Sequence, residues 1–266
     1  MTICVVDFLR FDARRPLAEL LVESDCPVHH TVDPVNDLAE SREVASLAEL
    51  AERYAVDLVD SATPPHVVVG VCAAAKLSLL ITAKLRKHEI DARCVLVDPR
   101  WAGLDDVAVS FEEVQRSMRS GVTSEEPNAA GRRIEQMLTV LDAELHAVFA
   151  KRGHGLETEP VIKALLNRYR AWFEFLRISG EAAPALPPTR LITPPGFAQP
   201  SWWTTCWHAT TISDLEQAIR YANQHVIDRI ITTIAEAGPD HSQADTGFLG
   251  TESKMNRHGV GVKTAR

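Results

Sequence analysis

The chain has 266 residues, of which 45% are hydrophobic and 24% are charged, and its formal net charge is -8 because 36 Asp and Glu outnumber 28 Lys and Arg. A chain of this length buries enough apolar surface to fold without disulfides or metal ions. Its acidic balance argues against a nucleic-acid-binding protein, which needs a dense patch of Lys and Arg to neutralise phosphates.

Five cysteines are scattered along the chain, and they form no C-x-x-C pair: Cys4, Cys26, Cys72, Cys94 and Cys206. Such a set excludes zinc-ribbon and thioredoxin-like motifs and argues against a disulfide framework, and we expect no metal site. The first residues lack the long apolar segment of a signal peptide, and no run reaches the ~18 apolar residues of a membrane span. We therefore expect a cytoplasmic protein that binds neither membranes nor nucleic acid.

Short apolar segments alternate with amphipathic ones through residues 1–98. The pattern predicts buried strands at Ile3–Asp7, Val28–Val32, His66–Val71 and Arg93–Asp98. It predicts helices between them at Pro16–Glu23, Ser46–Asp60 and Ala73–His88. The second helix begins with a capping box made by Ser46 and Glu49. Strands and helices at this spacing form right-handed βαβ units, so the sequence predicts an α/β fold with a doubly wound, mostly parallel sheet.

The alternation stops after the fourth predicted strand. Helical patterns follow at Ser110–Arg119, Pro127–Arg152 and Glu159–Ser179, so residues 110–180 form either a lid over a site or a second small domain. The sheet then resumes with strands at Thr189–Thr193 and Trp203–Trp207 and a long helix at Ile212–Glu236. We expect one domain over residues 1–237 and a mobile tail over residues 238–266, where apolar periodicity is weak.

The segment Gly70-Val71-Cys72-Ala73-Ala74 joins the predicted central strand to the helix after it. A nucleophile elbow needs such a strand-to-helix turn, with small residues two before and two after the nucleophile so that strand and helix approach closely. Gly70 and Ala74 occupy those positions. Cys72 would then lie at the helix N-terminus, where N–H groups stabilise a thiolate, and the N–H of Ala73 would face a developing oxyanion.

The same segment also suits an ordinary turn between a strand and a helix. Cysteine is a common buried residue, and any such turn in a parallel sheet accepts Gly and Ala. A nucleotide-binding domain is disfavoured, because the second and third glycines of a dinucleotide fingerprint are absent and no phosphate-binding loop occurs.

An acid and a base would complete the set that a nucleophilic cysteine uses. Asp98 ends the strand after the elbow helix, at the sheet edge where α/β proteins place their sites, although Asp-Pro also begins ordinary turns. His208 follows the segment Trp203–Trp207, just ahead of the last helix, although a loop histidine packed beside tryptophans is also common. Because nucleophile, acid and base each follow a predicted strand, we expect the three to converge on one edge. Second choices for the base and the acid are His29, His30, His66, Asp105 and Asp106.

With this order of nucleophile, acid and base, the sequence resembles the α/β-hydrolase family, and within it the thioesterase domains and stand-alone thioesterases of nonribosomal peptide and polyketide biosynthesis. The resemblance is specific over Gly70–Trp101, where the family has Gly-x-Ser/Cys-x-Gly/Ala and then an acid at the end of the next strand. The triad that it implies consists of Cys72, Asp98 and His208. It also implies a second oxyanion donor after the first strand, which would be the N–H of Phe8 or Leu9.

The sequence departs from the family pattern around its nucleophile. Cys72 replaces the usual serine, Ala74 replaces the second elbow glycine, and no glycine follows the first strand. A cysteine makes the acyl-enzyme a thioester, which stays activated toward amines, whereas a serine would give an oxoester.

The resemblance implies acyl transfer from a carrier-bound acyl or peptidyl thioester, by hydrolysis, amide formation or cyclisation, in specialised metabolism. Its partners would be an acyl or peptidyl carrier protein and either water or a small-molecule acceptor. No cofactor is expected besides the phosphopantetheine of the carrier-bound substrate. The residues expected to line an acyl pocket are Trp101, Trp203 and Trp207, and those that could meet an acidic carrier are Lys84, Arg86 and Lys87. The alternative is a catalytically inactive scaffold of the same fold.

Overall fold

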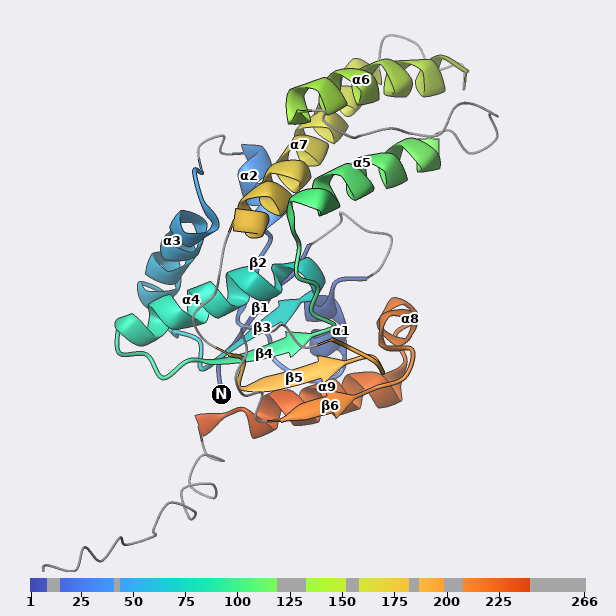
Figure 1. Cartoon of the computed structure of the whole chain (residues 1–266). Coiled ribbons are helices and arrows are strands. Elements are labelled where there is room, and N and C mark those ends of the chain that lie inside the picture. The colour runs from blue at the N-terminus through green and yellow to red at the C-terminus, as the bar shows by residue number, and fades with distance from the viewer. Residues whose placement is uncertain are drawn as a thin grey trace, which may run out of the picture.

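A parallel sheet organises the part of the chain that the structure, a computed structural model, describes (Figure 1). The described residues are 1–8, 15–40, 44–118, 133–151, 158–181, 187–198 and 208–239. The six strands are β1 Ile3–Val6, β2 His30–Val32, β3 Val67–Val71, β4 Arg93–Val97, β5 Arg190–Thr193 and β6 Ala209–Thr211. Their order across the sheet is β2-β1-β3-β4-β5-β6, and all neighbours are parallel. The predicted doubly wound α/β fold is confirmed.

The strand register decides which residues meet at the carboxyl edge of the sheet. Val71, the last residue of β3, lies beside Val97, and Val97 lies beside Ile192 of β5. Ile192 in turn lies beside Thr210 of β6. The segments that follow these four strands therefore leave the sheet at the same edge, which is where parallel α/β sheets build their sites.

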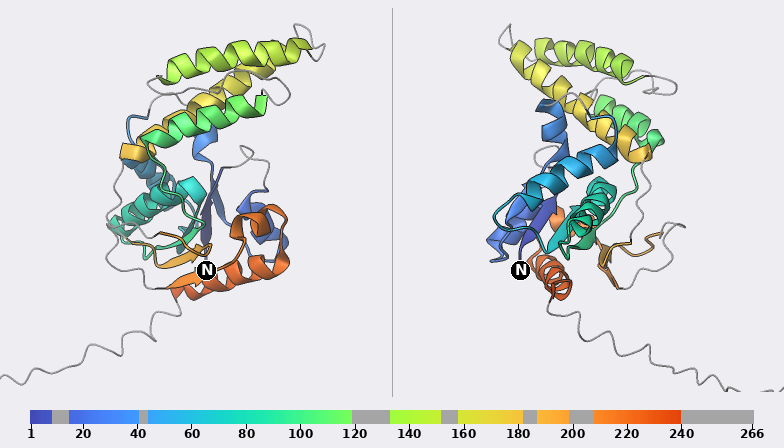
Figure 2. Two further views of the ribbon diagram at one scale, coloured as in Figure 1. Left: turned by 45° about the vertical axis from the view of Figure 1, so that its right-hand side comes forward. Right: turned by 90° about the vertical axis from the view of Figure 1, so that its left-hand side faces the viewer.

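Helices cover both faces of the sheet, as the two views in Figure 2 show. On one face, α3 (Leu47–Val59) and α4 (Ala75–Lys87) share a core with Val68 of β3. On the other face, α1 (Leu17–Glu23) and α9 (Gln224–Glu236) share a core with Val67 and Val69. Every side chain of β3 is buried, which explains its unbroken apolar sequence.

Three helices between β4 and β5 form the helical insertion: α5 (Leu104–Met118), α6 (Ile134–Lys151) and α7 (Glu159–Glu181). Helix α7 packs against α5 and α6 and also against α2 (Pro34–Glu40) and α3. Figure 1 shows the insertion standing above the sheet on the α3 side. The sequence predicted these helices, although α5 begins at Leu104 rather than Ser110. It did not predict α2.

The C-terminal part differs from the sequence prediction. Instead of one helix over Ile212–Glu236, the structure has two, α8 (Leu215–Arg220) and α9. Ala222 between them has φ 52°, which interrupts the helical backbone, and the Asn223 side chain then accepts a bond from the N–H of Val226 and caps α9. The strand expected at residues 203–207 lies outside the described residues, as do residues 240–266 of the expected tail.

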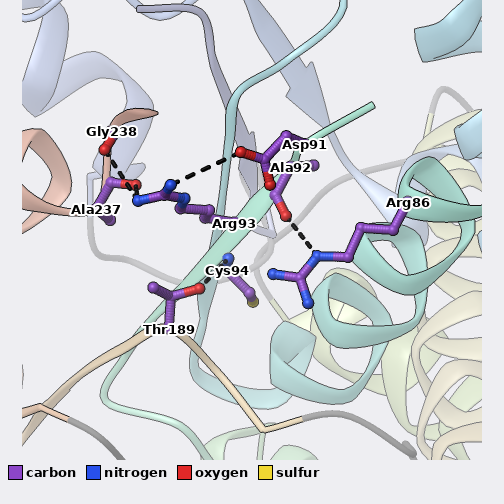
Figure 3. Close-up of polar contacts among 8 residues, drawn as sticks. All are labelled: Arg86, Asp91, Ala92, Arg93, Cys94, Thr189, Ala237 and Gly238. Carbon is purple, nitrogen blue, oxygen red and sulfur yellow. Dashed lines mark hydrogen bonds and ion pairs between the residues drawn. The ribbon is translucent and has the colours of Figure 1, made fainter. Parts of the chain in front are cut away.

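Polar contacts fasten the amino-terminal end of β4 (Figure 3). The Arg93 guanidinium Nη1 donates to the carbonyl oxygens of Ala237 and Gly238 at 3.3 and 3.0 Å, and so satisfies carbonyls at the end of α9. The N–H of Cys94 donates to Thr189 Oγ1 at 3.3 Å, just before β5. These contacts hold α9 and β5 in place and leave the opposite edge of the sheet open for a site.

Within the described ranges, every helix is too short or too polar to span a lipid bilayer.

Candidate functional site

A cavity of about 700 Å³ opens at the carboxyl edge of β4, β5 and β6. Its wall is made by Asp98 and Arg100 after β4, by Pro194 and Pro195 after β5, and by residues 213–217, with Arg220 and Tyr221 farther along. The lining is rich in charged side chains of both signs. Such a cavity suits a polar small molecule rather than a purely apolar one.

Cys72 occupies a strained turn directly after β3. Its φ is 52°, a conformation that costs a non-glycine residue ~1–3 kcal/mol and that clusters at functional sites. Cys72 begins a single 3-10 turn, Cys72–Ala74, which runs straight into α4. Its side chain is half-buried, whereas Cys4, Cys26 and Cys94 are buried. Among the described cysteines, Cys72 is thus the one placed like a nucleophile.

Gly70 has the close contact that the elbow motif predicts. A Cβ at this position would lie 2.6 Å from Ser78 Cβ on α4 and 3.0 Å from Leu96 Cδ2 on β4, and it would also overlap Ser78 Oγ. Real Cβ atoms do not approach other atoms so closely, so only glycine fits here. The contact lets α4 begin tightly against β3, which fixes the turn at Cys72.

Asp98 lies next to Cys72 across the sheet. Because Val71 and Val97 are register partners, the residues after them start from adjacent strands, which lie ~5 Å apart. Asp98 also has a left-handed φ, 47°, and its N–H donates to the carbonyl oxygen of Ile192 at 2.8 Å. The backbone therefore places Cys72 and Asp98 on adjacent strands at the same edge of the sheet.

Arg100 is a member of the site that the sequence analysis missed. Its N–H donates to the carbonyl oxygen of Cys72 at 3.1 Å, which ties the segment after β4 to the elbow. The pKa of the Arg100 guanidinium is raised, first by the charge of Cys72 and, against the opposing effect of burial, by Asp98 and Glu216. The same attraction favours the thiolate form of the cysteine. Apart from its place two residues after Asp98, the sequence carries no signal for this role.

Glu216 on α8 links the cavity's guanidinium groups. Its Oε2 lies 2.8 Å from Nη2 of Arg100, and its Oε1 lies 3.4 Å from Nη2 of Arg220. The first pair joins the loop after β4 to α8 across the cavity. Because these side chains are exposed, the pairs define geometry more than they add stability.

His208 lies at the start of the last strand. It directly precedes β6, and its carbonyl oxygen accepts the N–H of Leu191 within the sheet. The strand register places His208 three residues before the level of Cys72 at the carboxyl edge, and β6 is three strands away from β3. Its Cα is therefore roughly 17 Å from that of Cys72, from strand spacings of ~4.8 Å and a rise of ~3.3 Å per residue. Two side chains do not bridge that gap, so the structure does not bring His208 to Cys72.

The second-choice histidines lie at the amino-terminal edge. His66 directly precedes β3, and its Nδ1 accepts the N–H of Thr2 at 3.2 Å. His29 and His30 lie at the start of β2. Among the described residues that line the cavity, none is a histidine. In the same part of the chain, no group of three or more His, Cys, Asp or Glu side chains could hold a metal ion.

The two expected oxyanion donors differ in their surroundings. The N–H of Phe8 donates to Oδ1 of the buried Asp7 at 2.8 Å, and Oδ2 of Asp7 accepts the N–H of Leu17. The ring of Phe8 packs edge-on against Trp172 of α7, at 5.0 Å between centroids. Phe8 therefore fastens the segment after β1 and does not offer its N–H to a substrate, whereas Leu9 lies outside the described residues.

Ala73 has the position that an oxyanion donor requires. It directly follows Cys72 in the 3-10 turn and is buried, so its N–H is the first one after the nucleophile. Its role as a donor stays a prediction.

Trp101 packs against the sheet beside α4. It lies against a cluster that includes Leu79, Cys94 and Leu96, and it is not among the described residues that line the cavity. Trp203 and Trp207 lie outside the described residues. The role of Trp101 in an acyl pocket stays a prediction.

The other charged candidates face elsewhere. Asp105 and Asp106 belong to the first turn of α5. The basic residues at the end of α4 lie near the amino-terminal end of β4, where Arg86 Nε donates to the carbonyl oxygen of Ala92 at 2.8 Å (Figure 3). Lys84 pairs with Glu52 of α3.

A buried lysine connects the elbow helix to the helical insertion. Lys76, in the first turn of α4, donates from Nζ to the carbonyl oxygens of Ala102 at 3.0 Å and Ser179 at 2.7 Å. Burial lowers the pKa of Lys76, and the charge of Asp106 opposes that effect. The sequence alone gave no reason to single out this residue.

No protein-family model matches the chain, and no curated protein matches it either. Solved structures do match. A mutant of YbtT, the type II thioesterase from the yersiniabactin NRPS/PKS biosynthetic pathway, is 14% identical over 89% of this chain and 94% of its own, with a TM-score of 0.51. The fold of the chain, a parallel six-stranded sheet covered by helices, is similar to that of this thioesterase.

Two other structures have a similar extent of match. The NocB thioesterase domain from the nocardicin cluster is 15% identical over 88% of this chain and 93% of its own, with a TM-score of 0.49. The RedJ thioesterase from the prodiginine pathway of Streptomyces coelicolor is 15% identical over 87% and 85%, with a TM-score of 0.49. At such identities the likeness concerns the fold.

Proposed function

We propose that this protein transfers an acyl or peptidyl group from a carrier-bound thioester, in specialised metabolism, with Cys72 as the nucleophile. The observation that carries the proposal is the strained turn at Cys72, held between Gly70 and α4 and faced by the charge of Arg100. The likeness in fold to a type II thioesterase supports a thioester as the substrate class.

The first step needs no histidine if the cysteine reacts as a thiolate. The N-terminus of α4 and the Arg100 guanidinium both favour the negative sulfur. The sulfur attacks the carbonyl carbon of the carrier-bound thioester, a new C–S bond forms, and the C–S bond to the carrier breaks. The carrier's phosphopantetheine leaves as a thiolate and takes a proton from solvent. One thioester replaces another, so the step is nearly isoenergetic.

The second step uses the carboxylate beside the sulfur. Asp98 lines the cavity and is a neighbour of Cys72 across the sheet. In the proposal it accepts a proton from the attacking water or small-molecule acceptor, as a general base does. The acceptor forms a bond to the acyl carbon, the C–S bond breaks, and Cys72 returns as a thiolate next to Arg100. The N–H of Ala73 donates to the oxyanion in both steps.

The partners follow from this chemistry. The donor is an acyl or peptidyl carrier protein, and phosphopantetheine enters only as part of that substrate. Water or a small molecule is the acceptor, and the reaction is hydrolysis, amide formation or cyclisation according to which one occupies the cavity.

Intact-protein mass spectrometry tests the nucleophile. The protein is incubated with acyl-N-acetylcysteamine thioesters, and the expected result is a mass increase of one acyl group on Cys72. Cys72→Ala should abolish the adduct, Cys72→Ser should react far more slowly because the first step has no base to deprotonate a hydroxyl, and Cys26→Ala is the matched control that keeps the adduct. An unmodified wild-type protein, or an adduct that survives in Cys72→Ala, would contradict the proposal.

A second candidate is a catalytically inactive scaffold that binds a biosynthetic partner through the helical insertion. It is favoured by the lack of a histidine among the described residues that line the cavity. Labelling with a thiol reagent separates the two functions. An enzyme should be labelled first at Cys72 with a rate that depends on pH, whereas a scaffold should show no such preference over the other cysteines.

A further inference from the structure

The cavity at the carboxyl edge of the sheet contains charged groups of both signs. Its carboxyl groups belong to Asp98, Asp214 and Glu216, and its guanidinium groups belong to Arg100 and Arg220. A patch of one sign would suit a polyanion or a polycation. A mixed lining instead suits a small molecule that itself carries both charges.

Ion pairs link the cavity's two guanidinium groups through one carboxylate. Glu216 accepts from both, through Arg100 at 2.8 Å and Arg220 at 3.4 Å. This group of three side chains therefore has a net positive charge. Each guanidinium has five N–H groups and gives only Nη2 to Glu216, so donors remain for a further anion.

Two further carboxyl groups, those of Asp98 and Asp214, line the cavity. Asp98 stands at the end of β4, next to the elbow, and Asp214 directly precedes α8. The Asp214 side chain is exposed and makes no capping bond to its own helix. Its φ of 53° turns the loop after β6 at the sheet edge that carries Cys72.

We infer that the cavity binds an acceptor of the amino-acid type, a primary amine that also carries a carboxylate. The inference rests on the acyl transfer proposed above and names its acceptor. Asp98 and Asp214 attract the amine. The remaining donors of Arg100 and Arg220 bind the carboxylate.

The chemistry of the acyl-enzyme agrees with such an acceptor. The ammonium group loses one proton to solvent, and the free amine attacks the thioester carbon. A C–N bond forms, the second proton passes from nitrogen to the Asp98 carboxylate, and the C–S bond breaks to release Cys72 as a thiolate. The product is an amide, and Asp98 returns its proton to solvent. No oxidant, reductant or nucleotide is consumed once the thioester is loaded.

Other ligand classes fit the lining less well. A nucleotide or another polyphosphate would meet three carboxylates, which repel it. An uncharged alcohol would offer no charge to the guanidinium and carboxylate groups of the lining. Water needs no cavity of about 700 Å³.

A competition between matched acceptors tests the inference. The acyl-enzyme is formed from an acyl-N-acetylcysteamine thioester, its mass is recorded, and it is then mixed with alanine, ethylamine or lactate. Alanine carries amine and carboxylate, ethylamine lacks the carboxylate, and lactate lacks the amine. Chromatography with mass detection measures the amide, ester and free acid that are released. We expect alanine to give amide at least tenfold faster than ethylamine, and lactate to give no ester.

Substitutions in the cavity should act on one charge at a time. Arg220→Gln should raise the KM for alanine about tenfold and leave that for ethylamine unchanged. Asp214→Asn, which tolerates the left-handed backbone, should raise the KM for both amines. The matched controls are Arg229→Gln on α9 and Asp57→Asn on α3, both exposed and outside the cavity lining. They should leave the KM for alanine and the KM for ethylamine unchanged.

The outcomes separate this inference from the proposed function. If the adduct forms on Cys72 but is released only by water, or equally by all acceptors, the acceptor class is wrong and acyl transfer stands. If no adduct forms, acyl transfer itself fails and the inference fails with it. If Arg220→Gln affects alanine and ethylamine alike, the carboxylate is not bound there, and the inference is overturned.

Discussion

Replacing Gly70 by alanine should destabilise the protein by overpacking the contact between β3 and α4. The new Cβ would meet Ser78 Cβ at 2.6 Å and Leu96 Cδ2 at 3.0 Å. Neither neighbour can move away easily, since Ser78 is on a buried helix face and Leu96 is inside the sheet. The helix must therefore shift away from the strand, and the turn at Cys72 shifts with it.

The expected cost follows from the size of the overlap. Adding a methyl group to a well-packed core costs about 1–3 kcal/mol, and a contact this short with two fixed neighbours lies near the upper value. A loss of ~3 kcal/mol should lower Tm by roughly 6–12 °C in a protein of this size. Labelling of Cys72 by a thiol reagent should slow as well, because the elbow no longer holds its geometry.

Denaturant unfolding measures the change, and the chain offers a matched control. Gly103→Ala adds the same methyl group where the nearest atom, Asp106 Oδ2, would be 3.5 Å away, so it should be nearly neutral. The double variant Gly70→Ala with Ser78→Gly should recover part of the loss, because the closest atoms are removed. If Gly70→Ala and Gly103→Ala unfold at the same denaturant concentration, the close-packing account of the elbow is refuted.

Three further predictions concern electrostatics and backbone strain. Arg100→Gln should slow alkylation of Cys72 by iodoacetamide about fivefold at neutral pH, and Arg100→Lys should restore most of the rate. A unit charge ~6 Å away is worth ~3 kcal/mol at an effective dielectric constant of 20, and exposure reduces this to about 1 kcal/mol. An unchanged rate would show that the guanidinium does not act on the sulfur. Burial lowers the folded-state pKa of Lys76 from 10.5, so the unfolded chain binds more protons between that lowered value and 10.5. Over this interval the unfolding free energy of the wild type should rise with pH relative to that of Lys76→Met. A flat or falling difference would contradict a lowered pKa of Lys76 in the folded state. Ala222→Gly should raise the unfolding free energy by about 1 kcal/mol, because φ is 52° there, whereas Ala218→Gly inside α8 should lower it by a similar amount. Equal effects of the two glycines would exclude strain at position 222.

The sequence by itself determined the sheet and the elbow. Parallel strands covered on both faces must be apolar throughout, so β1, β3 and β4 stand out as short runs between amphipathic helices. The elbow was visible because its backbone leaves no room for a side chain at Gly70, and this constraint is local. Asp98 followed from the same logic, since it directly ends a strand next to the one that carries Cys72.

Only the tertiary structure decided which groups surround the sulfur. His208 precedes a strand of three residues, too short to be distinguished from its neighbours by sequence pattern, so its side of the sheet depended on the register with β5. Arg100 acts through space on Cys72 and pairs with Glu216, 116 positions later, a contact without any local signal. Periodicity reports what a segment buries along its own length. Periodicity cannot show which charged residue from a distant part of the chain lies beside that segment, because this depends on how whole helices and strands pack.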